Sequence, residues 1–96
     1  MADLQIEARR LAILELLKAD SDYSINDALL QDLLGQVGHG VSLAVVRADL
    51  AWLESVNLLA VNDLGGCSVA VLRSDGLDVA RGLAKVPGVA RPRPGA

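Results

Sequence analysis

Few side chains in this sequence have the types and spacing that catalysis or metal binding needs. The chain holds one histidine, His39, and one cysteine, Cys67, far apart in sequence, whereas a structural zinc site takes about four such ligands. The lone cysteine has no partner for an internal disulfide. There is no Ser-His-Asp set and no glycine-rich phosphate loop, since Gly65-Gly66 is typical of a hairpin turn. We therefore expect a protein that is not an enzyme and that uses no metal and no cofactor.

The residues best suited to binding are arginines, and Arg47 is the most informative of them. It follows a capping serine, Ser42, on a segment rich in alanine. An arginine in this place can donate hydrogen bonds to a guanine edge or to a phosphate. It can equally pair with Asp49, with Glu54 or with a neighbouring helix, and the sequence leaves both roles open. The residues predicted to contact DNA are Ser42, Leu43, Ala44, Arg47, Ala48, Arg73, Arg91 and Arg93.

The first predicted helix, residues 4–19, carries more apolar surface than one core face needs. Leu4, Ala8 and Leu11 form a stripe beside its main apolar side. We expect these three residues to lie in a homodimer interface, and the alternative is that they pack within the domain. The arginine pair Arg9-Arg10 is expected either to bind backbone phosphates or to bury its stems at that interface.

Two further helices are predicted to follow. The second is capped at Ser24 or Asn26 and runs to about Val37. The third is expected over residues 43–55, because Ser42 offers a capping oxygen and apolar residues recur at i, i+4 and i+7. The acidic side chains of both helices are expected to form solvated faces.

Short strands and a last helix complete the predicted elements. Residues 23–25 are a candidate short strand, and residues 58–61 and 67–72 are predicted to pair as a hairpin around the loop 63–66. Ser74 is expected to cap a short helix over about residues 75–85.

The end of the chain is predicted to be a flexible tail. Residues 86–96 are rich in proline and glycine, and Pro87 cannot continue a helix. The expected domain therefore spans residues 1–85. The tail arginines can follow a minor groove or the phosphates, or they can serve only as a solubilising end.

The overall charge is acidic, but it is unevenly distributed. The net charge is −3 and the isoelectric point is about 4.9, which disfavours strong binding to phosphates. Residues 1–63 hold ten acids and four bases, whereas residues 64–96 hold two acids and five bases. No apolar run approaches the roughly 20 residues of a membrane-spanning helix, and the acidic start of the chain does not resemble a signal peptide. We expect a cytoplasmic protein without membrane contact.

The order of the predicted elements matches a winged helix-turn-helix domain. The expected fold is α+β and mainly helical, with a three-helix core, a β-hairpin wing and a short C-terminal helix. Residues 41–54 resemble the recognition helix of bacterial regulators of the DeoR and ArsR type, in which a capping serine precedes a Val-Arg-x-Asp-Leu-x-x-Leu core. Residues 58–61 resemble their first wing strand, and residues 72–80 resemble their link into the last helix.

A second resemblance covers nearly the whole chain. It is to small winged-helix proteins encoded by Mu-like bacteriophages and prophages, and it lies in residues 10–14, 23–26, 49–53, 76–82 and 86–92. The resemblance implies a phage origin, a bacterial host and presumed DNA binding. The chain departs from typical regulators in its third helix, where Arg47 is the one base and stands beside Asp49 and Glu54.

Two functions are compatible with these expectations. The first is a phage-encoded transcriptional regulator that binds double-stranded DNA as a homodimer, with the third helix of each copy in one half-site. The alternative is a winged-helix adaptor that does not bind DNA and contacts a phage or host protein in phage development or assembly. The fold and the family resemblance favour the first function, whereas the acidic first two-thirds of the chain favours the second.

Overall fold

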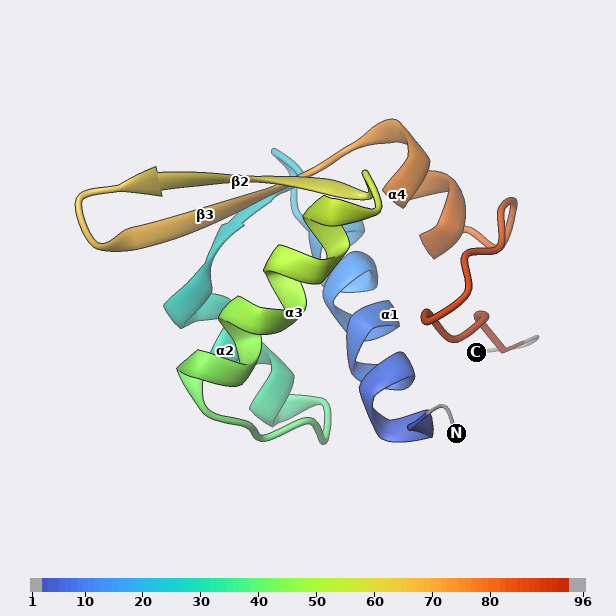
Figure 1. Cartoon of the computed structure of the whole chain (residues 1–96), viewed down its shortest axis with the longest axis horizontal. Helices are drawn as coiled ribbons and strands as arrows, with labels where there is room; N and C mark the ends of the chain where they lie inside the picture. The colour runs from blue at the N-terminus through green and yellow to red at the C-terminus, as the bar shows by residue number, and fades with distance from the viewer. Residues whose placement is uncertain (1–2, 94–96) are drawn as a thin grey trace.

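A three-stranded sheet and four helices build this protein, for which the computed structural model describes residues 3–93. The sheet lies along one side of the helices, and its hairpin of β2 and β3 projects beyond them (Figure 1). The predicted α+β class is confirmed. The arrangement of the helices and the hairpin is consistent with a winged-helix layout.

Three helices supply most of the core, and each begins at a side chain that caps it. Their bounds are Leu4–Ala19 for α1, Asp27–Gln36 for α2 and Leu43–Ser55 for α3. Asp3, Asn26 and Ser42 accept hydrogen bonds from backbone N–H groups in the first turns, which have no partner within the helix. The predicted bounds of α1 and α3 are confirmed. For α2, the cap is Asn26 rather than Ser24.

The sheet is antiparallel, with β3 between its two neighbours. The strands are Ser24–Asn26 for β1, Leu59–Leu64 for β2 and Cys67–Leu72 for β3. Leu64 lies opposite Cys67, so the hairpin turn is only Gly65-Gly66. Both glycines have positive φ, 58° and 88°, as a two-residue hairpin turn of this hand requires. The hairpin is confirmed, although β2 extends three residues beyond its predicted end.

The last helix, α4, spans Ser74–Ala80 and is shorter than predicted. Its N-cap is Arg73, and no side chain accepts from its first N–H groups, so the prediction that Ser74 is the cap was wrong. The helix ends well before Pro87 because Gly82 adopts a φ of 79°, the left-handed conformation that terminates many helices.

The core is aliphatic, as the composition predicts, but it also encloses two carboxylates. Asp27 on α2 and Asp49 on α3 are only 2% and 4% exposed, so the prediction that the acids of these helices are solvated was wrong for both. The apolar side chains that are completely buried include Ile13, Leu14, Leu17, Leu30, Leu34, Val46 and Leu53. Within residues 3–93, no helix is both long and apolar enough to cross a membrane.

The predicted flexible tail is packed against the domain over its described part. Val89 is buried in the core, and the backbone N–H of Ala90 donates to the carbonyl oxygen of Glu7 in α1 (3.2 Å). Residues 86–93 therefore extend the domain past the predicted boundary at residue 85. Residues 1–2 of the predicted domain and 94–96 of the predicted tail lie outside the described residues.

Candidate nucleic-acid interface

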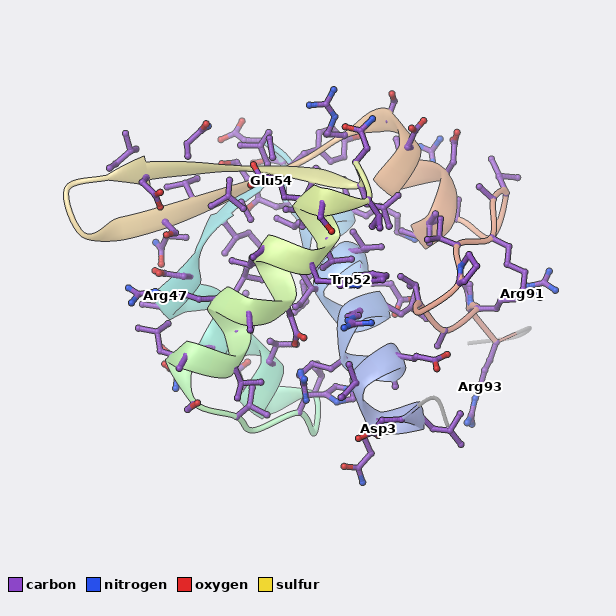
Figure 2. All side chains as sticks on the ribbon, viewed as in Figure 1. Asp3, Arg47, Trp52, Glu54, Arg91 and Arg93 are labelled. Atoms are coloured by element: carbon purple, nitrogen blue, oxygen red, sulfur yellow. The ribbon has the colours of Figure 1, made fainter. Side chains whose placement is uncertain are left out.

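One side of α3 faces solvent, while Val46, Leu50 and Leu53 bury its opposite side. The exposed residues of α3, called here the outer face of α3, are Ala44, Arg47, Ala48, Ala51, Glu54 and Ser55. Most of these side chains are small, so another surface can approach the helix backbone closely. The hairpin is tied to the same helix, because the Glu54 carboxylate accepts the backbone N–H of Val61 in β2 (2.7 Å). Arg47 and Glu54 lie at different levels of this face (Figure 2).

Arg47 lies where α2, α3 and the hairpin turn meet. Its Nε donates to the carboxylate of Asp27 (2.8 Å), and its Nη2 donates to the carbonyl oxygen of Gly66 (3.4 Å). The Asp27 side chain is 3% exposed, whereas that of Arg47 is 48% exposed. A guanidinium has five N–H donors, so those not directed at Asp27 and Gly66 are available to a ligand. The pairing with a neighbouring helix that the sequence left open is therefore present, and it orients the side chain without burying it.

Asp27 is a strong anchor for this arginine because it is held on several sides. The backbone N–H of Ala28 donates to it at 2.8 Å and that of Ser68 at 3.4 Å, and the Cys67 Sγ lies 3.9 Å away. The hydrogen bond from Arg47 lowers the pKa of the Asp27 carboxyl below its ordinary value, and the N–H of Ala28 acts in the same direction. Burial opposes these effects. Asp27 therefore stays ionised at neutral pH, and its negative charge lies directly beside the positive charge of Arg47.

Other charges near the outer face of α3 do not make it basic. Arg47 is the one base on α3, Glu54 is exposed on the same face, and Asp63 is exposed near the hairpin turn. The hydroxyl of Ser68 donates to Asp63 (2.7 Å). This surface therefore offers directional hydrogen bonding from one oriented arginine rather than a strongly positive potential.

Asp49 is not the partner of Arg47, contrary to one of the alternatives considered. It accepts hydrogen bonds from both Nε and Nη2 of Arg9 on α1, and the Nε of Arg10 lies 3.8 Å from it. The hydrogen bond to Asp49 raises the pKa of the Arg9 guanidinium above its ordinary value. The Arg9 and Arg10 side chains are only 12% and 18% exposed. The prediction that they meet phosphates or a second subunit was therefore wrong, since they bind within the chain.

Arg10 also joins α1 to α3 and to the tail. Its guanidinium lies over the ring of Trp52, 3.8 Å from the centroid, a geometry in which cation and ring attract. Its Nη1 donates to the carbonyl oxygen of Gly88 (3.1 Å). A Cβ on Gly88 would come within 2.7 Å of the Trp52 ring, so only glycine fits there. Sequence reasoning missed this cluster because no local spacing connects its three segments.

The remaining residues predicted to contact DNA are divided between distant places. Ser42, Leu43, Ala44 and Ala48 accompany Arg47 in the first half of α3. Arg73 is exposed at the base of the hairpin, where its backbone N–H donates to the carbonyl oxygen of Leu58. Arg91 and Arg93 are exposed on the tail, at the other end of the long axis from Arg47 (Figure 2). The structure therefore groups the α3 residues and separates the tail arginines from them.

The three residues predicted to form a dimer interface line a groove beside α1. Leu4 is 78% exposed at one end of it, Ala8 is half-buried and Leu11 is 8% exposed. Leu11 is largely covered by its own chain, so it has little surface left for a second subunit.

The comparisons with known proteins give the family of this chain. It is 47% identical over 92 residues to "Uncharacterized protein gp26" of Escherichia phage Mu. The aligned residues are 96% of this chain and 95% of the Mu protein. The chain therefore belongs to the family of this phage Mu protein, and the resemblance to proteins of Mu-like phages is confirmed. An "Uncharacterized protein" of Haemophilus influenzae is 34% identical over 62 residues, which are 65% of this chain and 60% of that protein. No family model and no solved structure matches.

Proposed function

We propose that this protein is a winged-helix, DNA-binding regulator of a Mu-like phage, and that the outer face of α3 enters the major groove of double-stranded DNA. The observation that supports this most directly is Arg47, which Asp27 orients while about half of its side chain stays exposed. A side chain that is already ordered loses little conformational freedom when it donates to a guanine edge. The small side chains of Ala44 and Ala48 allow the helix to reach the base edges.

In this proposal, binding depends more on directional contacts than on charge. Asp27 offsets the charge of Arg47, and Arg73 at the hairpin base is a further exposed candidate for a phosphate contact. Each phosphate that is neutralised contributes about −0.9 to the slope of log K against log salt, so the single phosphate contact of Arg73 gives an expected slope of only about −1 per copy. Two copies on one site add their contacts, and for this reason we also propose that the DNA-bound form is a homodimer.

The first experiment is a selection of bound sequences from random duplex DNA, run with folded protein at low and at moderate salt. We expect a recurrent motif with a guanine in each of two half-sites, spaced by about 10 base pairs or a multiple of that. Sedimentation of the selected complex should give two copies per duplex. Recovery of no motif at low salt would reject DNA binding.

A pair of variants then isolates the role of Arg47. Replacing Arg47 alone would leave the buried carboxylate of Asp27 without its cation, so we compare Asp27→Asn with the double variant Asp27→Asn, Arg47→Ala. The single variant should bind the selected DNA at least as tightly as wild type, because the amide oxygen can still accept the hydrogen bond that orients Arg47 while a negative charge is lost beside the arginine. The double variant should bind about 10-fold to 100-fold more weakly than the single variant, the usual effect of losing one bidentate base contact.

Arg81→Ala is the matched control for this pair. Arg81 is an exposed arginine at the C-cap of α4 and belongs to no proposed contact. It should leave the affinity for the selected DNA unchanged. Equal affinities of the single and double variants would show that Arg47 does not read DNA.

A further inference from the structure

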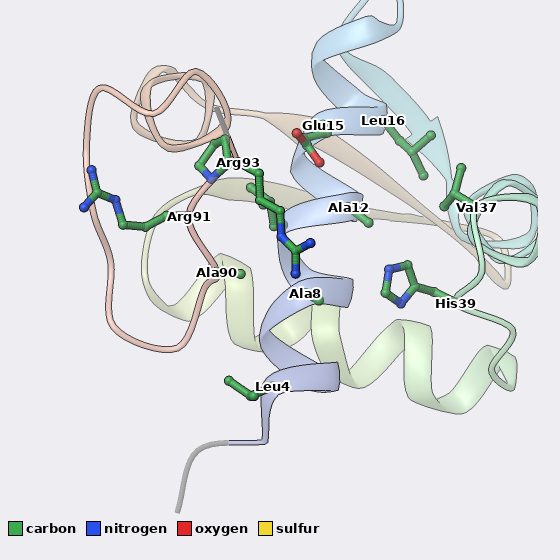
Figure 3. Close-up of a pocket in the computed structure, with 12 residues that line it drawn as sticks. Leu4, Ala8, Ala12, Glu15, Leu16, Val37, His39, Ala90, Arg91 and Arg93 are labelled. Atoms are coloured by element: carbon green, nitrogen blue, oxygen red, sulfur yellow. The ribbon is translucent and has the colours of Figure 1, made fainter. Parts of the chain in front are cut away.

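A second surface, separate from the outer face of α3, is a groove of about 560 Å³ beside α1. Its floor is the side of α1 from Leu4 to Leu16, with Ala8 and Ala12 at its centre (Figure 3). One wall is the segment that carries Val37 and His39, and the other is the tail segment 90–93. At 1.5 Å per residue, this floor is about 18 Å long, which matches a short helix or peptide.

The groove is bordered by apolar side chains that are exposed to solvent. Leu4 is 78% exposed and Val37 is 53% exposed, and the two lie at different edges of the hollow (Figure 3). Small side chains at Ala8 and Ala12 make the floor deep. Exposed apolar residues around a hollow are typical of a surface that binds a partner.

The charges around the groove favour an acidic partner. Arg91 and Arg93 are exposed on the tail wall, and Glu15 is the one carboxylate among the lining residues. None of the ion pairs within residues 3–93 includes these three side chains. As far as residues 3–93 show, both arginines, in a chain of net charge −3, are therefore available to carboxylates that approach from outside.

The shape of the groove disfavours a second copy of the chain as its occupant. In a two-fold dimer, the same patch of each subunit meets itself, so the contact must be self-complementary. Two grooves placed face to face would enclose a void, whereas a protruding segment of another molecule would fill one of them. A helix that lays its apolar side into such a hollow is a common mode of peptide recognition.

We propose that this groove binds an amphipathic helix of another protein, with an apolar stripe packed on Ala8 and Ala12 and with carboxylates directed at Arg91 and Arg93. The groove shares no residue with the outer face of α3. This inference is therefore independent of DNA binding, and either one can fail while the other holds.

The test uses a displayed library of random peptides of about 16 residues, long enough to cover the floor as a helix. The library is selected against the wild-type protein and depleted against Ala8→Glu, which places a charge at the centre of the floor. We expect the surviving peptides to carry apolar residues at i, i+3, i+4 and i+7 and to be enriched in Asp and Glu over the input. Ala28→Glu, an exposed position on α2 that does not line the groove, is the control and should retain these peptides.

Charge reversal of the tail wall then tests the second half of the proposal. The double variant Arg91→Glu, Arg93→Glu changes only exposed side chains, and thermal unfolding would verify that it folds as wild type does. By fluorescence anisotropy, it should bind the selected acidic peptides at least about 10-fold more weakly. Versions of the same peptides with Lys in place of Asp and Glu should bind it more tightly than they bind wild type.

Three results would overturn the proposal. The first is that no peptide distinguishes wild type from Ala8→Glu, and the second is that the selected peptides lack acidic enrichment or ignore the charge reversal. The third is that sedimentation shows self-association that Ala8→Glu abolishes and Ala28→Glu preserves, which would make a second copy the occupant.

Discussion

Two buried carboxylates of this protein each hold an arginine that comes from a different helix. Asp27 holds Arg47, and Asp49 holds Arg9. Arg47 and Asp49 are only two positions apart on α3, and residues with this spacing point to different sides of a helix. For that reason, they belong to separate ion pairs, one beside the hairpin turn and one beside α1.

The Asp27–Arg47 pair predicts how stability depends on pH. Because the pKa of Asp27 is lowered in the folded state, the stabilising effect is complete above the ordinary carboxyl pKa of 3.8 and is lost as the pH falls through the folded-state value. Asp27→Asn should lower stability at neutral pH and should reduce the further loss on acidification below about pH 4. Urea unfolding of both proteins at several pH values measures this. Parallel curves of stability against pH would show that Asp27 has an ordinary pKa.

The Asp49–Arg9 pair predicts a large loss of stability on truncation. Asp49→Ala would leave Arg9 and Arg10 without their carboxylate in a largely buried place, so we expect a loss of about 3–5 kcal/mol in the free energy of unfolding. Asp32→Ala, at an exposed position of α2, should change it by less than about 0.5 kcal/mol. Denaturant melts give both values, and similar effects of the two substitutions would contradict the role of Asp49.

At the scale of elements, the sequence predicts the helix bounds and turns that residues close together in the chain determine. The bounds of α1 and α3 follow from capping side chains and an absence of breakers, and Gly65-Gly66 marks the hairpin turn. The end of α4 was misjudged because Pro87 is a visible stop, whereas the left-handed Gly82 is only one of several glycines in the sequence. The face of α3 was predicted correctly, but the burial of its Asp49 depends on a contact with α1 that no local pattern contains.

The packing of α4 predicts a matched pair of glycine substitutions. A Cβ on Gly76 would lie 2.0 Å from the carbonyl oxygen of Leu58, so α4 would have to move away from the chain between α3 and β2. We expect Gly76→Ala to cost about 1–3 kcal/mol or more of stability. Gly35→Ala has open space around it in α2 and should be neutral or stabilising by up to about 1 kcal/mol. Thermal or urea unfolding would compare them, and a harmless Gly76→Ala would contradict the close approach.

At the scale of the whole molecule, the described part of the tail, residues 86–93, packs as part of the domain; this packing is called here the closure of the domain. The segment 86–93 packs on α1, covers one side of Trp52 through Gly88 and forms one wall of the groove. The domain boundary predicted at residue 85 therefore divides a single packed unit.

This closure predicts a specific effect of Gly88→Ala. The new methyl group would meet the Trp52 ring, and the φ of 96° at this position is unfavourable for any residue with a Cβ. The tail should detach locally, so the fluorescence of Trp52, the one tryptophan, should shift to longer wavelength and residues 86–93 should become sensitive to proteases. Gly40→Ala, where nothing lies within 4 Å, should change neither. Unchanged fluorescence and protection in Gly88→Ala would contradict the closure.

The contact between Arg10 and Gly88 has a consequence for the order in which the parts of the protein fold. On the ribosome, Gly88 joins the growing polypeptide 78 residues after Arg10, when all of α3 has already been synthesised. During translation, the indole of Trp52 and the guanidinium of Arg10 are therefore present before Gly88 can contact them. Contacts between residues so distant in sequence form slowly, so docking of the segment 86–93 is expected to be the final step of folding.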